Sequence, residues 1–263
     1  MIQRTITGII FAAVLIGGIL FNYYTFLLLF SVITLLGLWE FYTLAEKTHH
    51  HPQKFIGLLL SALLIASIQL FFNTSYKHWS TVPVVLFIAI IFSLFIFELY
   101  RKRGNPFGNI AYTILGVLYI ALPIALLSTF SPLKVLGILF ILWTSDTGAY
   151  FSGMAFGKHK LFERISPKKT WEGAIGGGIL GLGMAYLLST YNKELNLTDW
   201  MGTALIILVA GNLGDLTESL FKRSIDIKDS GTILPGHGGI LDRFDSLILA
   251  TPFIFTYLQL RNL

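Results

Sequence analysis

A charged run near the end of the chain carries the residue types that handle phosphate groups. Residues 219–245 gather cations, carboxylates and one histidine in a chain that is otherwise apolar: Lys222, Arg223, Lys228, Asp229, His237, Asp242, Arg243 and Asp245. Cationic side chains bind phosphate oxygens, and carboxylates bind Mg²⁺. Both kinds in one short stretch predict phosphoryl-type chemistry.

Two aspartates lie on either side of the basic part of this run. Asp215 lies near the end of an apolar stretch, within Gly211-Asn212-Leu213-Gly214-Asp215, and Asp242 lies at the far side of the run. A carboxylate at membrane depth is costly and is a functional candidate by default. Two carboxylates with substrate phosphates and water form a usual Mg²⁺ arrangement. The alternative is that Asp215 pairs with a basic side chain only to be tolerated.

The cations within the run have two readings. Lys222 and Arg223 are expected to bind phosphates, Arg223 in a bidentate manner. Lys222 is also spaced for an ordinary helical ion pair with Glu218. Asp242, Arg243 and Asp245 would close the site or would form only a salt-bridged helix start.

The glycine-rich loop of the run offers backbone donors. It reads Pro235-Gly236-His237-Gly238-Gly239. Glycines permit positive φ angles, and successive N–H groups can cradle an anion. His237 is expected to donate to a phosphate or to shuttle a proton.

A second polar constellation lies upstream. Asp146 is another carboxylate inside an apolar span, and Ser166-Pro167-Lys168-Lys169-Thr170-Trp171-Glu172-Gly173 follows it. Ser166 is predicted to cap the next helix, with Pro167 at its first position and Glu172 near its first turn. Lys168, more than Lys169, is expected to contact substrate. The glycines after residue 173 predict tight helix packing and lack the ending of a nucleotide P-loop.

The elements that hold these residues are expected to be membrane helices. The 263 residues are 54% hydrophobic and 13% charged, with a mean hydropathy of +0.72. Long apolar runs without alternation predict spanning helices, because lipid leaves no partner for backbone groups outside a helix. We expect an all-α polytopic fold with about nine spans, at 4–21, 24–44, 55–72, 82–100, 109–129, 132–151, 173–190, 199–216 and 246–260.

Positive charges predict the orientation. With the N-terminus in the cytoplasm, 15 of the 19 Lys and Arg residues fall on the cytoplasmic side. The polar segments 152–172 and 217–245 then face the cytoplasm, where nucleotides are. The net charge of +5 fits this bias better than nucleic-acid binding, and the absence of cysteine excludes thiolate chemistry and disulfides.

The run also resembles the signature of the phosphatidate cytidylyltransferases, or CDP-diacylglycerol synthases. That pattern is Ser, Lys-Arg, Lys-Asp, Pro-x-His-Gly-Gly and Asp-Arg-x-Asp. It is met at Ser219, Lys222, Arg223, Lys228, Asp229, Pro235, His237, Gly238, Gly239, Asp242, Arg243 and Asp245. The loop from Ser166 to Gly173 is similar to the family's Ser-Pro-Lys-Lys-Thr-x-Glu-Gly segment.

The resemblance implies a site and a reaction. Its catalytic residues would be Asp215, Lys222, Arg223, His237, Asp242 and Arg243, with Mg²⁺ on Asp215 and Asp242. Its substrate-binding residues would be Asp146, Ser166, Lys168, Glu172, Lys228, Asp229, Gly238, Gly239 and Asp245. CTP and phosphatidic acid would give CDP-diacylglycerol and pyrophosphate.

The setting follows from the same reading. We expect one polytopic domain over 1–263, with N-terminal helices in 1–100 and the active site in 101–263. It would lie in the plasma membrane among its lipids, with the site on the cytoplasmic side and no nucleic-acid partner. A homodimer stays open. The rival hypotheses are a CTP-dependent kinase of a polyprenol-type lipid, nucleotidyl transfer to another lipid phosphate, a secondary transporter and a membrane scaffold.

Overall fold

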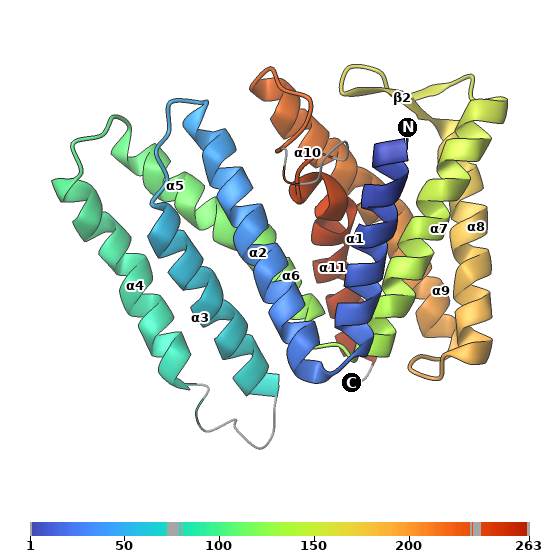
Figure 1. Ribbon diagram of the computed structural model, residues 1–263, viewed down its shortest axis with the longest axis horizontal. Coiled ribbons are helices and arrows are strands. Elements are labelled where there is room, and N and C mark those ends of the chain that lie inside the picture. The colour runs from blue at the N-terminus through green and yellow to red at the C-terminus, as the bar shows by residue number, and fades with distance from the viewer. Residues whose placement is uncertain (1, 73–78, 80, 232, 234–237, 262–263) are drawn as a thin grey trace. The chain divides into compact units, whose positions relative to one another are not determined.

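The computed structural model describes residues 2–72, 79, 81–231, 233 and 238–261 (Figure 1). Helices dominate this part of the chain, and one small hairpin is its only sheet. The prediction of an all-α polytopic membrane protein is therefore confirmed. His237 and Pro235 lie outside the described residues.

Seven helical stretches of the described chain are long and apolar enough to cross a membrane. They are Tyr23–Glu46, Lys54–Phe72, Thr81–Tyr100, Pro106–Leu127, Pro132–Phe156, Trp171–Tyr191 and Leu197–Ser224. A shorter apolar helical stretch covers Ile6–Leu20. Helix α11 (Leu241–Arg261) covers the last predicted span without meeting the same criterion. The total of nine spans stays a prediction.

The chain divides into two compact units. One unit comprises Met1–Thr129 with Asp229–Asp242, and the other comprises Phe130–Lys228 with Arg243–Leu263. The expected single domain stays a prediction, as does its division into N-terminal helices up to residue 100 and an active-site part after it.

The first unit is built from the N-terminal helices. Its elements are α1 (Ile2–Leu20), α2 (Tyr23–Glu46), α3 (Lys54–Phe72), α4 (Thr81–Tyr100), α5 (Pro106–Gly116), the π-helical turn η2 (Val117–Ala121) and α6 (Leu122–Leu127). Helices α2, α3 and α4 pack in sequence order, as Figure 1 shows from blue to green.

Tyr42 of α2 organises the core of this unit. Its ring is fully buried, and its hydroxyl donates to the Thr113 carbonyl at 2.8 Å. A Cβ atom at Gly57 or Gly116 would collide with that ring. The two glycines on α3 and α5 therefore make the space that Tyr42 fills, and the buried hydroxyl keeps a hydrogen bond.

The second unit holds the remaining elements. These are α7 (Pro132–Phe156), β1 (Lys160–Phe162), β2 (Ser166–Thr170), α8 (Trp171–Tyr191), α9 (Leu197–Ile206), η3 (Ile207–Gly211), α10 (Asn212–Ser224) and α11 from Arg243 onward. The antiparallel strands β1 and β2 form a hairpin that joins the end of α7 to the start of α8, above these two helices in Figure 1.

Small residues let α7 and α8 approach closely. A Cβ atom at Gly177 would lie 2.7 Å from the Ser145 carbonyl oxygen, and one at Gly148 would lie 3.0 Å from the Gly176 carbonyl oxygen. The close approach confirms the packing role for Gly176 and Gly177, where no larger side chain fits, whereas Gly183 has open space around it.

One local prediction was wrong. Ser166 does not cap a helix: it begins β2, and the Thr170 side chain caps α8 by accepting from Gly173 N. The helix that contains the span predicted at 199–216 continues to Ser224. Hydropathy marks where a helix leaves the apolar layer, whereas backbone hydrogen bonding continues into the polar segment.

A π-helical turn precedes the predicted site in this unit. Helices α9 and α10 are joined through η3 without a break, and α10 begins at Asn212. The Asn212 side chain donates to the Leu208 carbonyl at 2.7 Å. Single π-turns inside α-helices are often found at functional sites, because they change which side chains face a given direction.

Candidate active site

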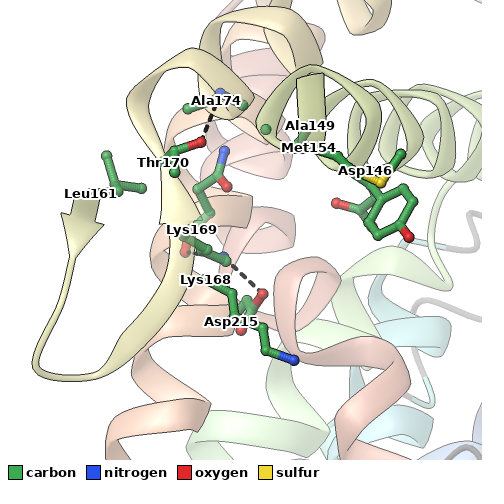
Figure 2. A pocket seen from close by; sticks show the side chains of 13 residues that line it. Asp146, Ala149, Met154, Leu161, Lys168, Lys169, Thr170, Ala174 and Asp215 are labelled. Carbon is green, nitrogen blue, oxygen red and sulfur yellow. Dashed lines mark hydrogen bonds and ion pairs between the residues drawn. The ribbon is translucent and has the colours of Figure 1, made fainter. Parts of the chain in front are cut away.

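A cavity of about 450 Å³ in the second unit collects several predicted site residues (Figure 2). Its polar lining includes Asp146 and Tyr150 of α7, Lys168 and Lys169 of β2, and Asn212 and Asp215 of α10. Apolar side chains, among them Met154 and Leu161, line the same space. A cavity with both kinds of wall suits a ligand with a charged head and an apolar body.

An ion pair between β2 and α10 lies in this cavity. Lys169 Nζ is 2.7 Å from Asp215 Oδ2, and Figure 2 shows the side chains meeting. The two side chains are 22% and 36% exposed, so the pair is partly shielded from water. Ser219 donates to the other carboxylate oxygen, Oδ1, at 3.2 Å. Pairing with a basic side chain was the alternative to metal binding that the sequence left open for Asp215. Lys169 is thus the counter-ion of the predicted metal ligand.

Asp215 also has carboxylate neighbours. Its negative charge repels those of Asp146 on α7 and Asp245 on α11. The positive charges of Lys169 and Lys222 attract Asp245. Within the described part of the chain, no three His, Asp or Glu side chains are close enough to hold a metal alone. The carboxylates fit Mg²⁺ nonetheless, because this ion usually takes one or two carboxylates and completes its shell with phosphate and water.

The last turn of α10 carries two cations that differ in burial and in their partners. Lys222 Nζ lies 2.7 Å from Glu218 Oε2, and both side chains are largely buried. Arg223 is exposed; its Nη1 donates to the Ile227 carbonyl at 3.4 Å. Among the described residues no carboxylate pairs with Arg223, so its guanidinium is available to a phosphate group.

The remaining signature residues lie in the following segment. Lys228 and Asp229 are exposed. Asp242 belongs to the first unit together with Gly238 and Gly239. Its Oδ2 accepts from Gly239 N at 2.8 Å and from Ser230 N at 2.9 Å.

Several predicted partners are divided between the two units. Arg243, which is exposed, and Asp245 continue α11 in the second unit. The predicted Mg²⁺ pair, Asp215 with Asp242, therefore joins residues of different units and stays a prediction, as does the role of His237.

Two predicted substrate contacts of the upstream segment, Ser166 and Glu172, are not part of the cavity lining. Ser166 pairs with Phe162 in the hairpin. Glu172 accepts from Lys158 N at 3.1 Å and lies 2.6 Å from His159 Nδ1. Glu172 thus holds the start of the hairpin against the start of α8.

Two residues of interest were underrated or missed. The sequence favours Lys168 over Lys169 as a substrate contact, and only the structure shows that Lys169 contacts Asp215. Glu40 is absent from the predicted site, although it is a lone carboxylate in the apolar sequence Leu38-Trp39-Glu40-Phe41. The rule that singled out Asp146 and Asp215 would also have found it.

Comparison with known proteins finds a matching family and relatives over nearly the whole chain. The Cytidylyltransferase family matches residues 2–261. Proteins named phosphatidate cytidylyltransferase are similar over nearly the whole length. That of Haemophilus influenzae is 35% identical, covering 97% of both chains, and that of Bacillus subtilis is 33% identical, covering 99% of this chain and 98% of its own. That of Staphylococcus saprophyticus is 35% identical, covering 95% and 96% respectively.

Proposed function

The chain belongs to the cytidylyltransferase family, and from this premise we propose that it transfers the CMP group of CTP to phosphatidic acid. The products would be CDP-diacylglycerol and pyrophosphate. The observation that carries the proposal is the cavity in which Lys168, Lys169 and Asp215 meet apolar side chains of membrane helices.

The proposed reaction is a displacement at the α-phosphorus of CTP. An oxygen of the lipid phosphate forms a bond to that phosphorus while the bond to the β-phosphate bridging oxygen breaks, and pyrophosphate leaves with the electron pair. The lipid phosphate is already ionised and needs little help from a base. What the reaction requires is neutralisation and alignment of several negative groups.

The chain's own cations supply this neutralisation in our proposal. Lys168 and Lys169 would bind phosphates within the cavity, with Asp215 orienting Lys169 through the 2.7 Å pair. Arg223, free of carboxylate partners in the described chain, would contact a phosphate from the end of α10. Lys222 is held by Glu218 and would act over a longer range.

We further propose that Mg²⁺ is the cofactor and that Asp215 is its principal ligand. Bound Mg²⁺ would supply charge neutralisation of the triphosphate. The second ligand predicted from the sequence is Asp242, and Asp146 and Asp245 are the carboxylates that act on Asp215 within its own unit. Substituting each of the four separately distinguishes these assignments.

The proposed setting is the cytoplasmic face of the cell membrane. The 15 Lys and Arg residues expected on that side support it, since cytoplasmic loops carry an excess of positive charge. Lipid substrate would then come from the bilayer and CTP from the cytoplasm.

An isotope assay tests the reaction directly. Purified protein is incubated with phosphatidic acid, Mg²⁺ and CTP labelled at either the α- or the γ-phosphate. We expect label in the lipid only from α-labelled CTP, with one pyrophosphate released per lipid product. Lipid labelled from the γ-phosphate would instead identify a CTP-dependent lipid kinase, and no labelled lipid from either would refute transfer to phosphatidic acid.

A further inference from the structure

Glu40 of α2 is a buried carboxylate that the proposed reaction does not use. It is 5% exposed and is surrounded in sequence by Leu38, Trp39 and Phe41. Burying an ionised carboxylate is costly unless hydrogen bonds compensate it. Among the described residues no Lys or Arg pairs with it, so its partners must be other donors.

Those donors come from the signature segment within the same unit. Ile240 N donates to Glu40 Oε1 at 2.9 Å, and Leu241 N donates to Oε2 at 3.0 Å. The Ser230 hydroxyl lies 3.3 Å from Oε2. Glu40 therefore accepts the backbone donors at the very start of α11, where a helix has N–H groups without internal partners.

Asp242 completes the same network from inside the segment. Its Oδ2 accepts from Gly239 N, and it lies 3.0 Å from the Ser230 hydroxyl that also approaches Glu40. Successive N–H groups at 239, 240 and 241 thus point at two carboxylates of the protein itself. The donors expected to cradle a substrate anion are occupied by Asp242 and Glu40.

The glycines of the segment fit around these carboxylates. A Cβ atom at Gly239 would lie 2.5 Å from Glu40 Oε2, and one at Gly231 would lie 2.6 Å from Oε1. Gly238 has a φ of +88°, and a Cβ there would collide with Asp242. Glycine is required at 239 because no side chain fits beside the buried carboxylate.

From these contacts we propose that Glu40 is a positioning residue: it fixes the segment from Ser230 to Asp242 and so sets the orientation of Asp242. It touches no substrate. Its kinetic consequence rests on the proposed function, whereas its effect on the segment does not. The chemical reason is that the two carboxylate oxygens of Glu40 are both acceptors, so they can accept from Ile240 N and from Leu241 N at the same time.

The test compares Glu40→Gln with Glu46→Gln. Glutamine keeps the shape of Glu40 but turns one acceptor into a donor that faces a backbone N–H. Glu46 lies on the same helix, is 39% exposed and pairs with Lys54 at 2.8 Å, so it is the matched control. Backbone amide exchange is measured by mass spectrometry on the purified protein, with peptides covering residues 239–241 and, for comparison, α3.

We expect Glu40→Gln to raise exchange at residues 239–241 by about ten-fold, with α3 unchanged. If wild-type protein makes CDP-diacylglycerol, kcat should fall by about ten-fold or more while KM for CTP changes less than about three-fold. Glu46→Gln should leave both measurements at wild-type values. An inactive wild type would refute the proposed function and leave the exchange result to decide on Glu40.

Unchanged exchange at 239–241 would overturn the proposal. So would a rise spread evenly over the segment and α3, which would mark Glu40 as an ordinary packing residue. A second pair of variants guards against misfolding. Gly231→Ala should be harmful alone and should add little to Glu40→Ala, since the three atoms nearest to a Cβ at Gly231 all belong to Glu40. If the effects of the two substitutions on exchange simply multiplied in the double variant, the positioning role of Glu40 would also be refuted.

Discussion

Lys169 Nζ and Asp215 Oδ2 are 2.7 Å apart, so a strand residue and a residue of a membrane helix form one ion pair inside the candidate cavity. The pair joins a cation suited to phosphate with a carboxylate suited to Mg²⁺. Each side chain holds the other in place. In the proposed reaction, preorganisation of this kind would lower the reorganisation needed in the transition state.

Removing the cation of this pair should slow the reaction. Lys169→Ala is expected to lower kcat by about 10²-fold, because charge on the leaving pyrophosphate loses a partner. Lys160→Ala is the matched control, since Lys160 is an exposed lysine of the same hairpin outside the cavity. Equal kinetics for the two variants would remove Lys169 from the mechanism.

The two predicted Mg²⁺ ligands, Asp215 and Asp242, should each be needed for activity. Asp215→Asn and Asp242→Asn are each expected to lower kcat by about 10²-fold or more at saturating Mg²⁺ while the protein still folds. Asp146→Asn and Asp245→Asn test the carboxylates that act on Asp215. Activity is titrated against Mg²⁺ for all four.

Asp226→Asn is the control for this series. Asp226 is exposed and has a φ of +54°, a conformation that asparagine also tolerates. Near-full activity of either Asp215→Asn or Asp242→Asn at high Mg²⁺ would show that the metal assignment is wrong for that residue.

Arg223 and Lys222 should respond differently to truncation. Arg223→Ala is expected to lower kcat by about 10²-fold with little change in the thermal midpoint, since no carboxylate in the described chain depends on it. Lys222→Ala should lower the thermal midpoint as well, because it leaves Glu218 buried without this cation. Thermal scans in detergent, run beside the assay, separate the two effects.

The geometry of the Arg223 contact can be tested separately. Arg223→Lys keeps the charge but loses the planar fork, so a partial loss of kcat would indicate bidentate binding. If Arg223→Ala changes only the thermal midpoint and spares kcat, Arg223 is structural.

The orientation in the membrane can be measured by cysteine labelling. The chain has no cysteine, so Lys160→Cys and Lys228→Cys each provide a single thiol. An impermeant reagent should label them only after the membrane of the cell is opened. Lys193→Cys, in the predicted outer loop, should be labelled on intact cells. The reverse pattern would refute a cytoplasmic site.

Much of the fold could be predicted because membrane helices have a strong hydropathy signal. Every predicted span corresponds to helical structure, including 109–129, which is realised as α5, η2 and α6 in succession. The β-hairpin was not foreseen, since β1 and β2 are short and polar and carry no such signal. The end of α10 at Ser224 could not be predicted from hydropathy, because hydropathy falls before the helix stops.

The site was predicted less completely, because its contacts join residues that are far apart in the sequence. Asp146, Lys168 and Asp215 were found as charges in or beside apolar runs, and they line one cavity. The contact of Lys169 with Asp215 depends on how the hairpin folds over α10, which composition does not encode. Glu40 contacts residues at 230, 240 and 241, and no local pattern links α2 to that segment.

The π-turn η3 has a consequence for how this chain tolerates a change in length. A π-turn contains one residue more than the α-helical turn it replaces. Deleting a single residue from Ile207–Gly211 would give a regular α-helical turn and leave the following residues facing nearly the same way. Deleting one residue from the α-helical stretch Leu197–Ile206 would instead rotate all that follows by about 100°, and Asp215 would turn away from Lys169. One-residue deletions in α9 should therefore be as damaging as loss of Asp215 itself, whereas η3 should tolerate them better.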